Sequence, residues 1–113
     1  MSEVTIYHNP RCSKSRQTLE LLRSRGIEPH IVEYLKTPLE ESALTDLLAQ
    51  LELPVRDLVR GQDYRALNLP EPDGEQGWLA ALAAHPEIMQ RPVVVAGGQA
   101  RLGRPPENVL DIL

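Results

Sequence analysis

The strongest constraint on the fold lies near the N-terminus, where a strand, a tight turn, a helix and a second strand follow one another closely. Val4–Tyr7 is β-prone, and Asn9-Pro10 marks a turn because proline fixes its own φ and pushes the preceding residue out of the helical region. The helical run continues to about Arg25, and residues 31–34 predict the second strand. This order predicts a βαβ unit with parallel strands and a right-handed crossover.

Cys12, the only cysteine of the chain, lies where this turn passes into the helix. Unpaired backbone N–H groups and the positive end of the helix dipole meet at such a position, and both stabilise an anion. Arg11, Lys14 and Arg16 add positive charge nearby. The sequence therefore predicts a reactive thiolate at Cys12. The alternative is a small buried residue, which is the common state of a free cysteine.

The middle of the chain predicts helices. Thr37 and Glu40 form an expected capping box, with Pro38 at the first helical position. The buried stripe of that helix is expected at Leu44, Leu47, Leu48 and Leu51.

The segment that follows is less regular. Pro54 opens a short helical piece, and residues 61–77 are polar and rich in proline and glycine, which predicts a loop or an irregular helical insertion. A further helix is expected over about residues 75–84, with Trp78 facing the core.

The end of the chain predicts a β-hairpin and a last helix. Residues 91–95 form an expected third strand with Pro92 at its entrance, and Gly97-Gly98 turns the chain into residues 99–102. Pro105-Pro106 marks the start of the last helix.

Together these elements predict an α/β fold, a four-stranded mixed sheet with helices on both faces and a helical insertion. This is the thioredoxin-like arrangement, in which a cis-proline at the position of Pro92 lies against the active-site loop. Residues 1–113 are expected to form a single domain of this kind.

Composition excludes several classes of function. A net charge of -4 leaves no basic surplus for neutralising phosphates, so no nucleic-acid partner is expected. No apolar run reaches membrane-spanning length and no signal-peptide pattern begins the chain, so we expect a cytoplasmic protein without a membrane partner. One cysteine with the scattered His8, His30 and His85 matches no metal-site spacing, so no metal is expected.

Four segments carry a family resemblance, in this order along the chain. They are residues 6–16 around Cys12, residues 55–60, which end in Arg60, residues 91–95, and residues 101–105, which contain Arg104. Together they resemble the small thioredoxin-fold arsenate reductases that use glutathione and glutaredoxin, and the resemblance runs nearly end to end.

The resemblance implies a role for each matching residue. Cys12 would be the nucleophile, and the oxyanion would be surrounded by Arg60, Arg91 and Arg104. Arginine suits that role because its planar fork donates paired hydrogen bonds and keeps its charge. The alternative is three solvated surface arginines, the commonest state of this residue type.

His8 and Ser15 match positions near the thiol that help to hold it ionised, His8 through its electrostatic effect and Ser15 through a hydrogen bond from its hydroxyl to the thiolate. Each residue could instead have a purely structural role. His8 can be a loop histidine that only hydrogen-bonds the backbone, and Ser15 can simply belong to the first helical turn.

Ser15 also stands where a dithiol oxidoreductase carries the second cysteine of C-x-x-C. Nothing inside the chain can therefore resolve an adduct at Cys12, and the resolving thiol must come from outside. The resemblance names the substrate arsenate, the co-substrate glutathione and the partner glutaredoxin, with no bound cofactor.

Three other functions stay open. The first is a thiol-dependent oxidoreductase of the same fold acting on another substrate, such as a glutathione mixed disulfide. The second is a transcriptional regulator similar to the Spx family, although those proteins usually carry the C-x-x-C switch that this chain lacks. The third is a non-catalytic thioredoxin-like binding domain, in which Cys12 would be dispensable.

Overall fold

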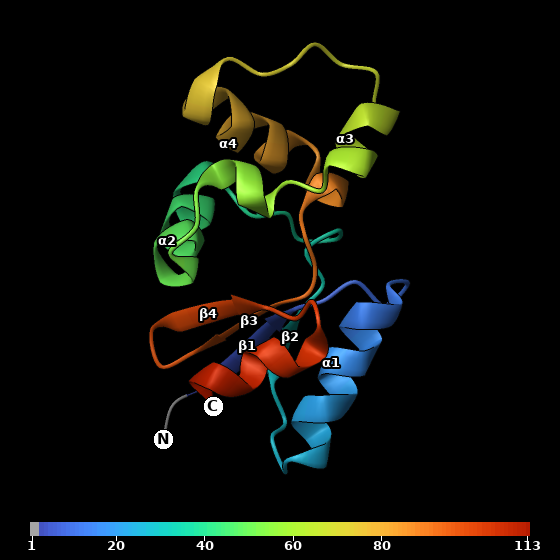
Figure 1. The fold of residues 1–113 in the computed structure, drawn as a ribbon, viewed down its shortest axis with the longest axis vertical. Coiled ribbons are helices and arrows are strands. Elements are labelled where there is room, and N and C mark those ends of the chain that lie inside the picture. Colours follow the sequence, from blue (N-terminus) through green and yellow to red (C-terminus); the bar gives the residue numbers. More distant parts are fainter. Residues whose placement is uncertain (1–2) are drawn as a thin grey trace. The chain divides into compact units, whose positions relative to one another are not determined.

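The computed structural model describes residues 3–113 and divides the chain into two compact units. The first unit combines the chain up to Thr37 with Arg91–Leu113, and the second comprises Pro38–Gln90. The first unit holds the sheet and the second is helical (Figure 1). That the whole chain behaves as one domain stays a prediction.

The sheet of the first unit has four strands in the order β2-β1-β3-β4. Strand β1 (Val4–Tyr7) pairs in parallel with β2 (His30–Val32) and antiparallel with β3 (Val93–Ala96), which pairs with β4 (Gln99–Leu102). The β3–β4 turn is made by Gly97 and Gly98, whose φ angles of 60° and 79° suit glycine. The mixed sheet confirms the predicted α/β class.

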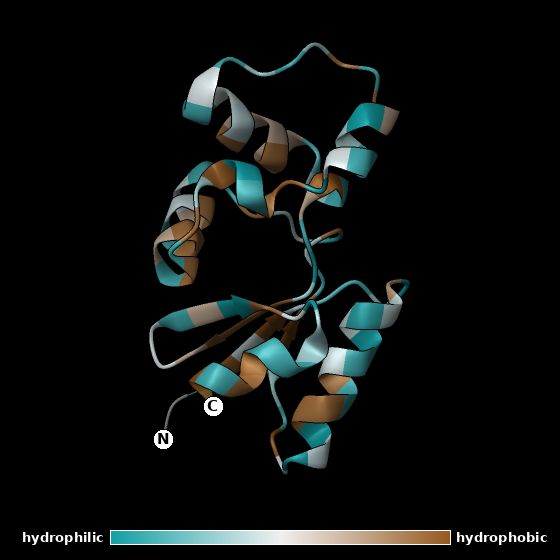
Figure 2. Cartoon of the chain, viewed as in Figure 1, coloured by the Kyte–Doolittle hydropathy of each residue, from teal (hydrophilic) through white to brown (hydrophobic). Residues whose placement is uncertain are grey.

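Two helices pack side by side on one face of this sheet, α1 (Ser13–Ser24) and the 3₁₀ helix η3 (Pro106–Ile112) (Figure 1). Between them and the sheet lies a cluster of fully buried side chains: Ile6, Leu22, Val94 and Val109. Ile6 and Val94 are direct cross-strand partners. The hydrophobic colour of β3 in Figure 2, whose four residues are all apolar, marks the sheet side of this core.

The second unit contains three α-helices and two short 3₁₀ helices: α2 (Glu41–Leu51), η1 (Val55–Leu58), α3 (Gly61–Ala66), α4 (Gly74–Ala84) and η2 (Pro86–Ile88). Helices α2 and α4 pack against each other. A short antiparallel bridge joins Val59 to Met89, and the Arg60 N–H donates to the Ile88 carbonyl at 2.7 Å. This bridge fixes the backbone at Arg60.

The third strand begins at Val93, two residues later than predicted. Two further predicted boundaries were wrong, for one shared reason. Strand β2 ends at Val32, and helix α2 begins after Glu40, so Thr37 is not its N-cap. The Glu33 carbonyl accepts the N–H groups of Lys36 and Thr37, at 2.9 and 3.0 Å. These bonds close a turn directly after β2, and the chain stays non-helical until Glu40.

Residues 61–77, predicted as a loop or an irregular insertion, contain helix α3 and the first turn of α4. Tyr64 anchors α3, since its ring is buried and packs against Trp78 at a centroid distance of 4.9 Å. The aromatic contact explains why so polar a segment is ordered.

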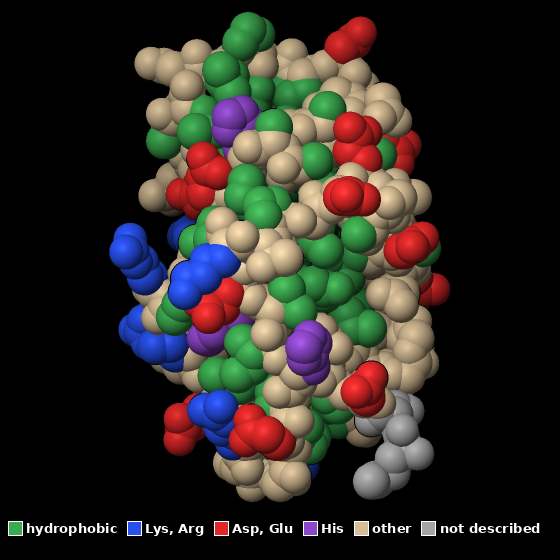
Figure 3. Space-filling model, turned by 180° about the vertical axis from the view of Figure 1, so that it is seen from behind, with side chains coloured by type: hydrophobic (Ala, Val, Ile, Leu, Met, Phe, Trp, Pro, Cys, Tyr) green, Lys and Arg blue, Asp and Glu red, His purple; other side chains and the backbone are tan. Residues whose placement is uncertain are grey.

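Asp and Glu side chains are spread over the face drawn in Figure 3, whereas the Lys and Arg side chains gather toward its left side. Within residues 3–113, no helix has both the length and the apolar character needed to cross a membrane.

Removing part of the core should destabilise the protein. Leu22 is completely buried between α1, η3 and the sheet, so Leu22→Ala should lower the free energy of unfolding by about 2–5 kcal/mol, measured by urea titration with circular dichroism. Leu35→Ala is the control, because Leu35 is 40% exposed and its truncation should cost about 0.5 kcal/mol or less. Equal effects of the two changes would contradict this core.

Candidate active site

The loop before α1 is shaped by hydrogen bonds from Asn9. Its side-chain oxygen accepts the Arg11 N–H at 3.0 Å, and its carbonyl accepts the Cys12 N–H at 3.0 Å. Cys12 has the extended backbone of an N-cap, with φ -92° and ψ 124°, and its carbonyl accepts the Arg16 N–H. The predicted position of Cys12 at the helix start is therefore confirmed.

The surroundings of Cys12 favour its ionised form. Partial burial alone would raise the pKa of the thiol, but the Ser15 N–H, the Arg91 side chain and the Lys14 N–H outweigh it and lower the pKa below its ordinary value. Cys12 makes no side-chain capping hydrogen bond at the start of α1. The half-buried Cys12 thus combines thiolate character with access to solvent.

Two of the three predicted arginines lie at this thiol. The Arg104 guanidinium points Nη1 at the Cys12 sulfur from 4.0 Å, a long contact, and donates to the Arg91 carbonyl at 3.0 Å. Arg91 contributes to the lowered pKa of Cys12 through its side chain. The loops at the entrance of β3 and the exit of β4 therefore bring two cations to one sulfur atom.

His8 and Ser15 form a buried pair in the same loop. His8 Nδ1 lies 2.7 Å from Ser15 Oγ, which also accepts the Asn9 N–H at 3.0 Å. Burial lowers the pKa of His8, Glu33 partly opposes this, and Arg23 and Arg16 lower it further. The ring is therefore neutral at neutral pH, so it adds no positive charge beside the thiolate.

Ser15 acts on Cys12 through its backbone N–H, since the described contacts of its hydroxyl are with His8 and Asn9. A neutral His8 with its proton on Nε2 can accept a hydrogen bond from the Ser15 hydroxyl at Nδ1. The pair thereby fixes the start of α1, whose N–H groups face the sulfur.

Arg60 lies in the second unit, at the N-cap of α3. Its guanidinium contacts the Asp63 carboxylate at 3.4 Å, and both side chains are about 30% exposed. A role for Arg60 at the oxyanion stays a prediction from the family resemblance.

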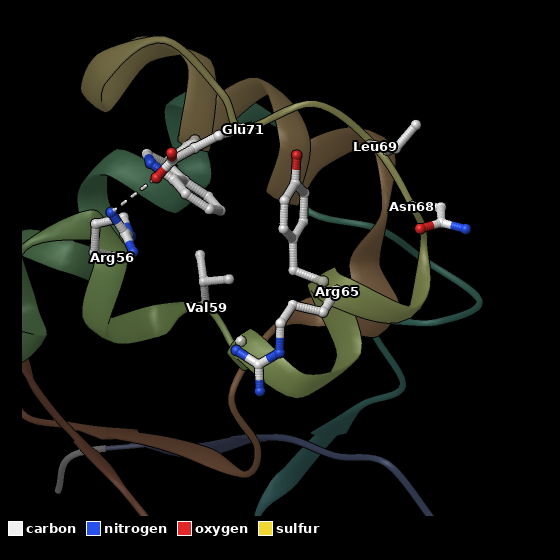
Figure 4. A pocket seen from close by; sticks show the side chains of 9 residues that line it. Arg56, Val59, Arg65, Asn68, Leu69 and Glu71 are labelled. Carbon is white, nitrogen blue, oxygen red and sulfur yellow. Dashed lines mark ion pairs between the residues drawn. The ribbon is translucent and has the colours of Figure 1, made fainter.

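The second unit also contains a pocket of about 520 Å³ (Figure 4). Tyr64 and Trp78 line it, and the Arg56 guanidinium lies 4.5 Å from the Trp78 ring centre and 3.7 Å from Glu71. The pocket lining includes none of the residues predicted for the thiol site. Among residues 3–113 we also find no cluster of His, Cys, Asp or Glu side chains suited to a metal ion.

Sequence reasoning missed two parts of the site. It took Asn9 only as a turn residue, although the Asn-Pro pair is a signal for the side-chain bond that shapes the loop. It also missed the Arg91 carbonyl, which holds Arg104 and has no signature in the sequence. Both Arg91–Pro92 and Arg104–Pro105 are cis peptide bonds, and only the first was suggested by the fold.

Fold and site together define a protein of thioredoxin-like fold with a single thiol beside two arginines. The sequence model of the ArsC family matches residues 7–112, so the chain belongs to the ArsC family.

Three relatives illustrate the similarity. The chain is 49% identical to "Uncharacterized protein YfgD" of Escherichia coli K12, covering 98% of this chain and 97% of that protein. It is 44% identical to an arsenate reductase of Neisseria meningitidis serogroup A over the whole of both chains. The solved structure of an arsenate reductase from Vibrio cholerae matches with a TM-score of 0.92 and 48% identity, covering 98% of each chain.

The thiol pKa can be tested one residue at a time. The pH midpoint of Cys12 alkylation should lie below the value of about 8.5 for free cysteine, because the thiolate is stabilised. Arg91→Ala should raise that midpoint, since it removes a hydrogen bond and a charge from the thiolate. Lys14→Ala is the matched control and should leave the midpoint nearly unchanged, because Lys14 acts through its backbone N–H. Equal shifts in the two variants would show that general positive charge, not the Arg91 contact, sets the pKa.

Proposed function

We propose that this protein is an arsenate reductase, which reduces arsenate to arsenite with Cys12 as its nucleophile. One observation carries the proposal. A thiol of lowered pKa lies beside Arg91 and Arg104 in a chain that is 44% identical, over its whole length, to a protein named arsenate reductase.

The arginines would reduce the electrostatic repulsion between the thiolate and arsenate. Arsenate at neutral pH is a tetrahedral anion, and a thiolate approaching it meets another negative charge. Arg91 and Arg104 would offset this repulsion with charge-assisted hydrogen bonds to the arsenate oxygens. Arg60 would supply a third guanidinium, as the resemblance implies.

The first step would be substitution at arsenic without a change of oxidation state. The Cys12 thiolate forms a sulfur–arsenic bond, and one arsenate oxygen leaves as water after protonation. A glutathione thiolate then displaces a second oxygen, again as water. Arsenic(V) is at that stage bonded to both sulfur atoms.

The second step would be the reduction. A glutaredoxin thiolate attacks the glutathione sulfur, and the electron pair of the broken sulfur–arsenic bond passes to arsenic, which becomes arsenic(III). Glutathione and glutaredoxin leave joined as a mixed disulfide. Water then releases arsenite and restores the Cys12 thiol. The outside thiols are needed because the chain has one cysteine, and these reductants suit a reducing compartment, which we expect to be the cytoplasm.

Cys12→Ser should keep the fold and abolish turnover, because a hydroxyl lacks the acidity and nucleophilicity of a thiol. The assay supplies arsenate, glutathione, glutaredoxin and a reducing system and follows arsenite. Omitting glutaredoxin from the parent reaction is the control for the proposed electron donor. Turnover retained by a folded Cys12→Ser protein would contradict the mechanism.

Arsenate should protect Cys12 from alkylation if the arginines hold it beside the sulfur. Arg91→Ala and Arg104→Ala should each weaken arsenate binding by roughly ten- to a hundredfold, as expected for loss of a charge-assisted contact worth about 1.5–3 kcal/mol. Arg→Lys variants should recover only part of the loss, since lysine keeps the charge without the paired donors.

Arg101→Ala is the matched control for the protection assay. The Arg101 guanidinium donates to the Ala100 carbonyl on β4, so its removal should leave protection unchanged. Absence of protection in the parent protein would favour the oxidoreductase of the same fold that acts on another substrate.

A further inference from the structure

Gly103 occupies a crowded point beside the thiol site. It is buried, it follows β4 directly, and its N–H donates to the Pro92 carbonyl at 2.9 Å. A Cβ atom on Gly103 would lie 2.6 Å from Thr18 Oγ1 and 2.7 Å from Pro92 Cγ. Such distances are shorter than real Cβ contacts, so the backbone at Gly103 lies where no side chain fits.

The two neighbours of Gly103 are themselves fixed. Thr18 is fully buried in α1, and its hydroxyl donates to the Lys14 carbonyl at 2.8 Å, one turn away. Pro92 is also fully buried, and it follows Arg91 in the chain. Neither can withdraw by turning a flexible side chain into solvent, so a larger residue at position 103 would displace the chain segment that carries it.

That segment carries Arg104. The Arg104 guanidinium reaches the Cys12 sulfur at 4.0 Å and the Arg91 carbonyl at 3.0 Å. With no Cβ atom on Gly103, this segment can lie close to Thr18 of α1, the helix whose N-cap is Cys12. A side chain at position 103 would therefore push Arg104 away from the thiol.

We propose that Gly103 is a positioning residue of the anion site, whose missing side chain lets Arg104 reach Cys12. The importance of this for turnover rests on the proposed function. The positioning itself does not, because it concerns a cation and a sulfur atom of the protein alone.

The test compares two alkylating reagents of similar size. Iodoacetate is an anion and iodoacetamide is neutral, and both form a carbon–sulfur bond at the Cys12 thiolate with loss of iodide. The ratio of their rates at low ionic strength reports the positive charge beside the sulfur. Arg104→Ala should lower this ratio roughly threefold or more, because it removes a cation close to the sulfur.

Gly103→Ala should lower the ratio to a similar extent. In an Arg104→Ala background it should have little further effect, because it acts through Arg104. Thr18→Ala alone should leave the ratio near that of the parent. Gly103→Ala combined with Thr18→Ala should recover part of the ratio, since the closest obstacle to the new methyl group is gone. If Gly103→Ala alone does not fold, the ratio measured in the Gly103→Ala, Thr18→Ala double variant tests the proposal instead.

The outcomes separate this inference from the proposed function. A folded Gly103→Ala protein with the parent ratio would overturn the positioning role, as would equal losses with and without Arg104. A purely structural role would lower the unfolding midpoint and leave the ratio unchanged. If the parent fails to reduce arsenate but these ratios behave as expected, the proposed substrate is wrong and the positioning stands.

Discussion

The site depends on stabilising one negative charge at the start of a helix. The Cys12 sulfur is partly buried, which by itself disfavours the thiolate, and backbone N–H groups of α1 together with Arg91 reverse that effect. The Asn9 turn and the His8–Ser15 pair then hold the loop in the shape that aims those N–H groups. These contacts together position one sulfur atom.

Much of the fold could be predicted from local signals. The strand at Val4–Tyr7, the helix that begins at Cys12 and the Gly97-Gly98 turn each carry their own signature, and the structure contains all three. The start of α2 could not be predicted in this way. Thr37 and Glu40 match a capping box, but the Glu33 carbonyl takes the Thr37 N–H into a turn instead. That competition depends on where β2 ends, which a short pattern does not encode.

Some residues of the candidate site could likewise be predicted from the sequence, and others could not. Cys12 could be found because it is the only cysteine and lies at a turn, and Arg91 and Arg104 were found through the family blocks. Gly103 and Thr18 lie close together although they are far apart in the chain. The sequence around a glycine does not show which residue packs against it. The neutral state of His8 likewise depends on burial and on charges from other segments. Such features follow from packing.

We propose that one cysteine starts the reduction of arsenate and cannot complete it. Reduction to arsenite takes two electrons, which two thiols supply in forming one disulfide, and this chain has one thiol. The most direct measurement mixes fully reduced protein with arsenate, without glutathione or glutaredoxin, and quantifies arsenite. No arsenite above background is expected until an outside thiol is added. Arsenite released in proportion to the protein alone would contradict it.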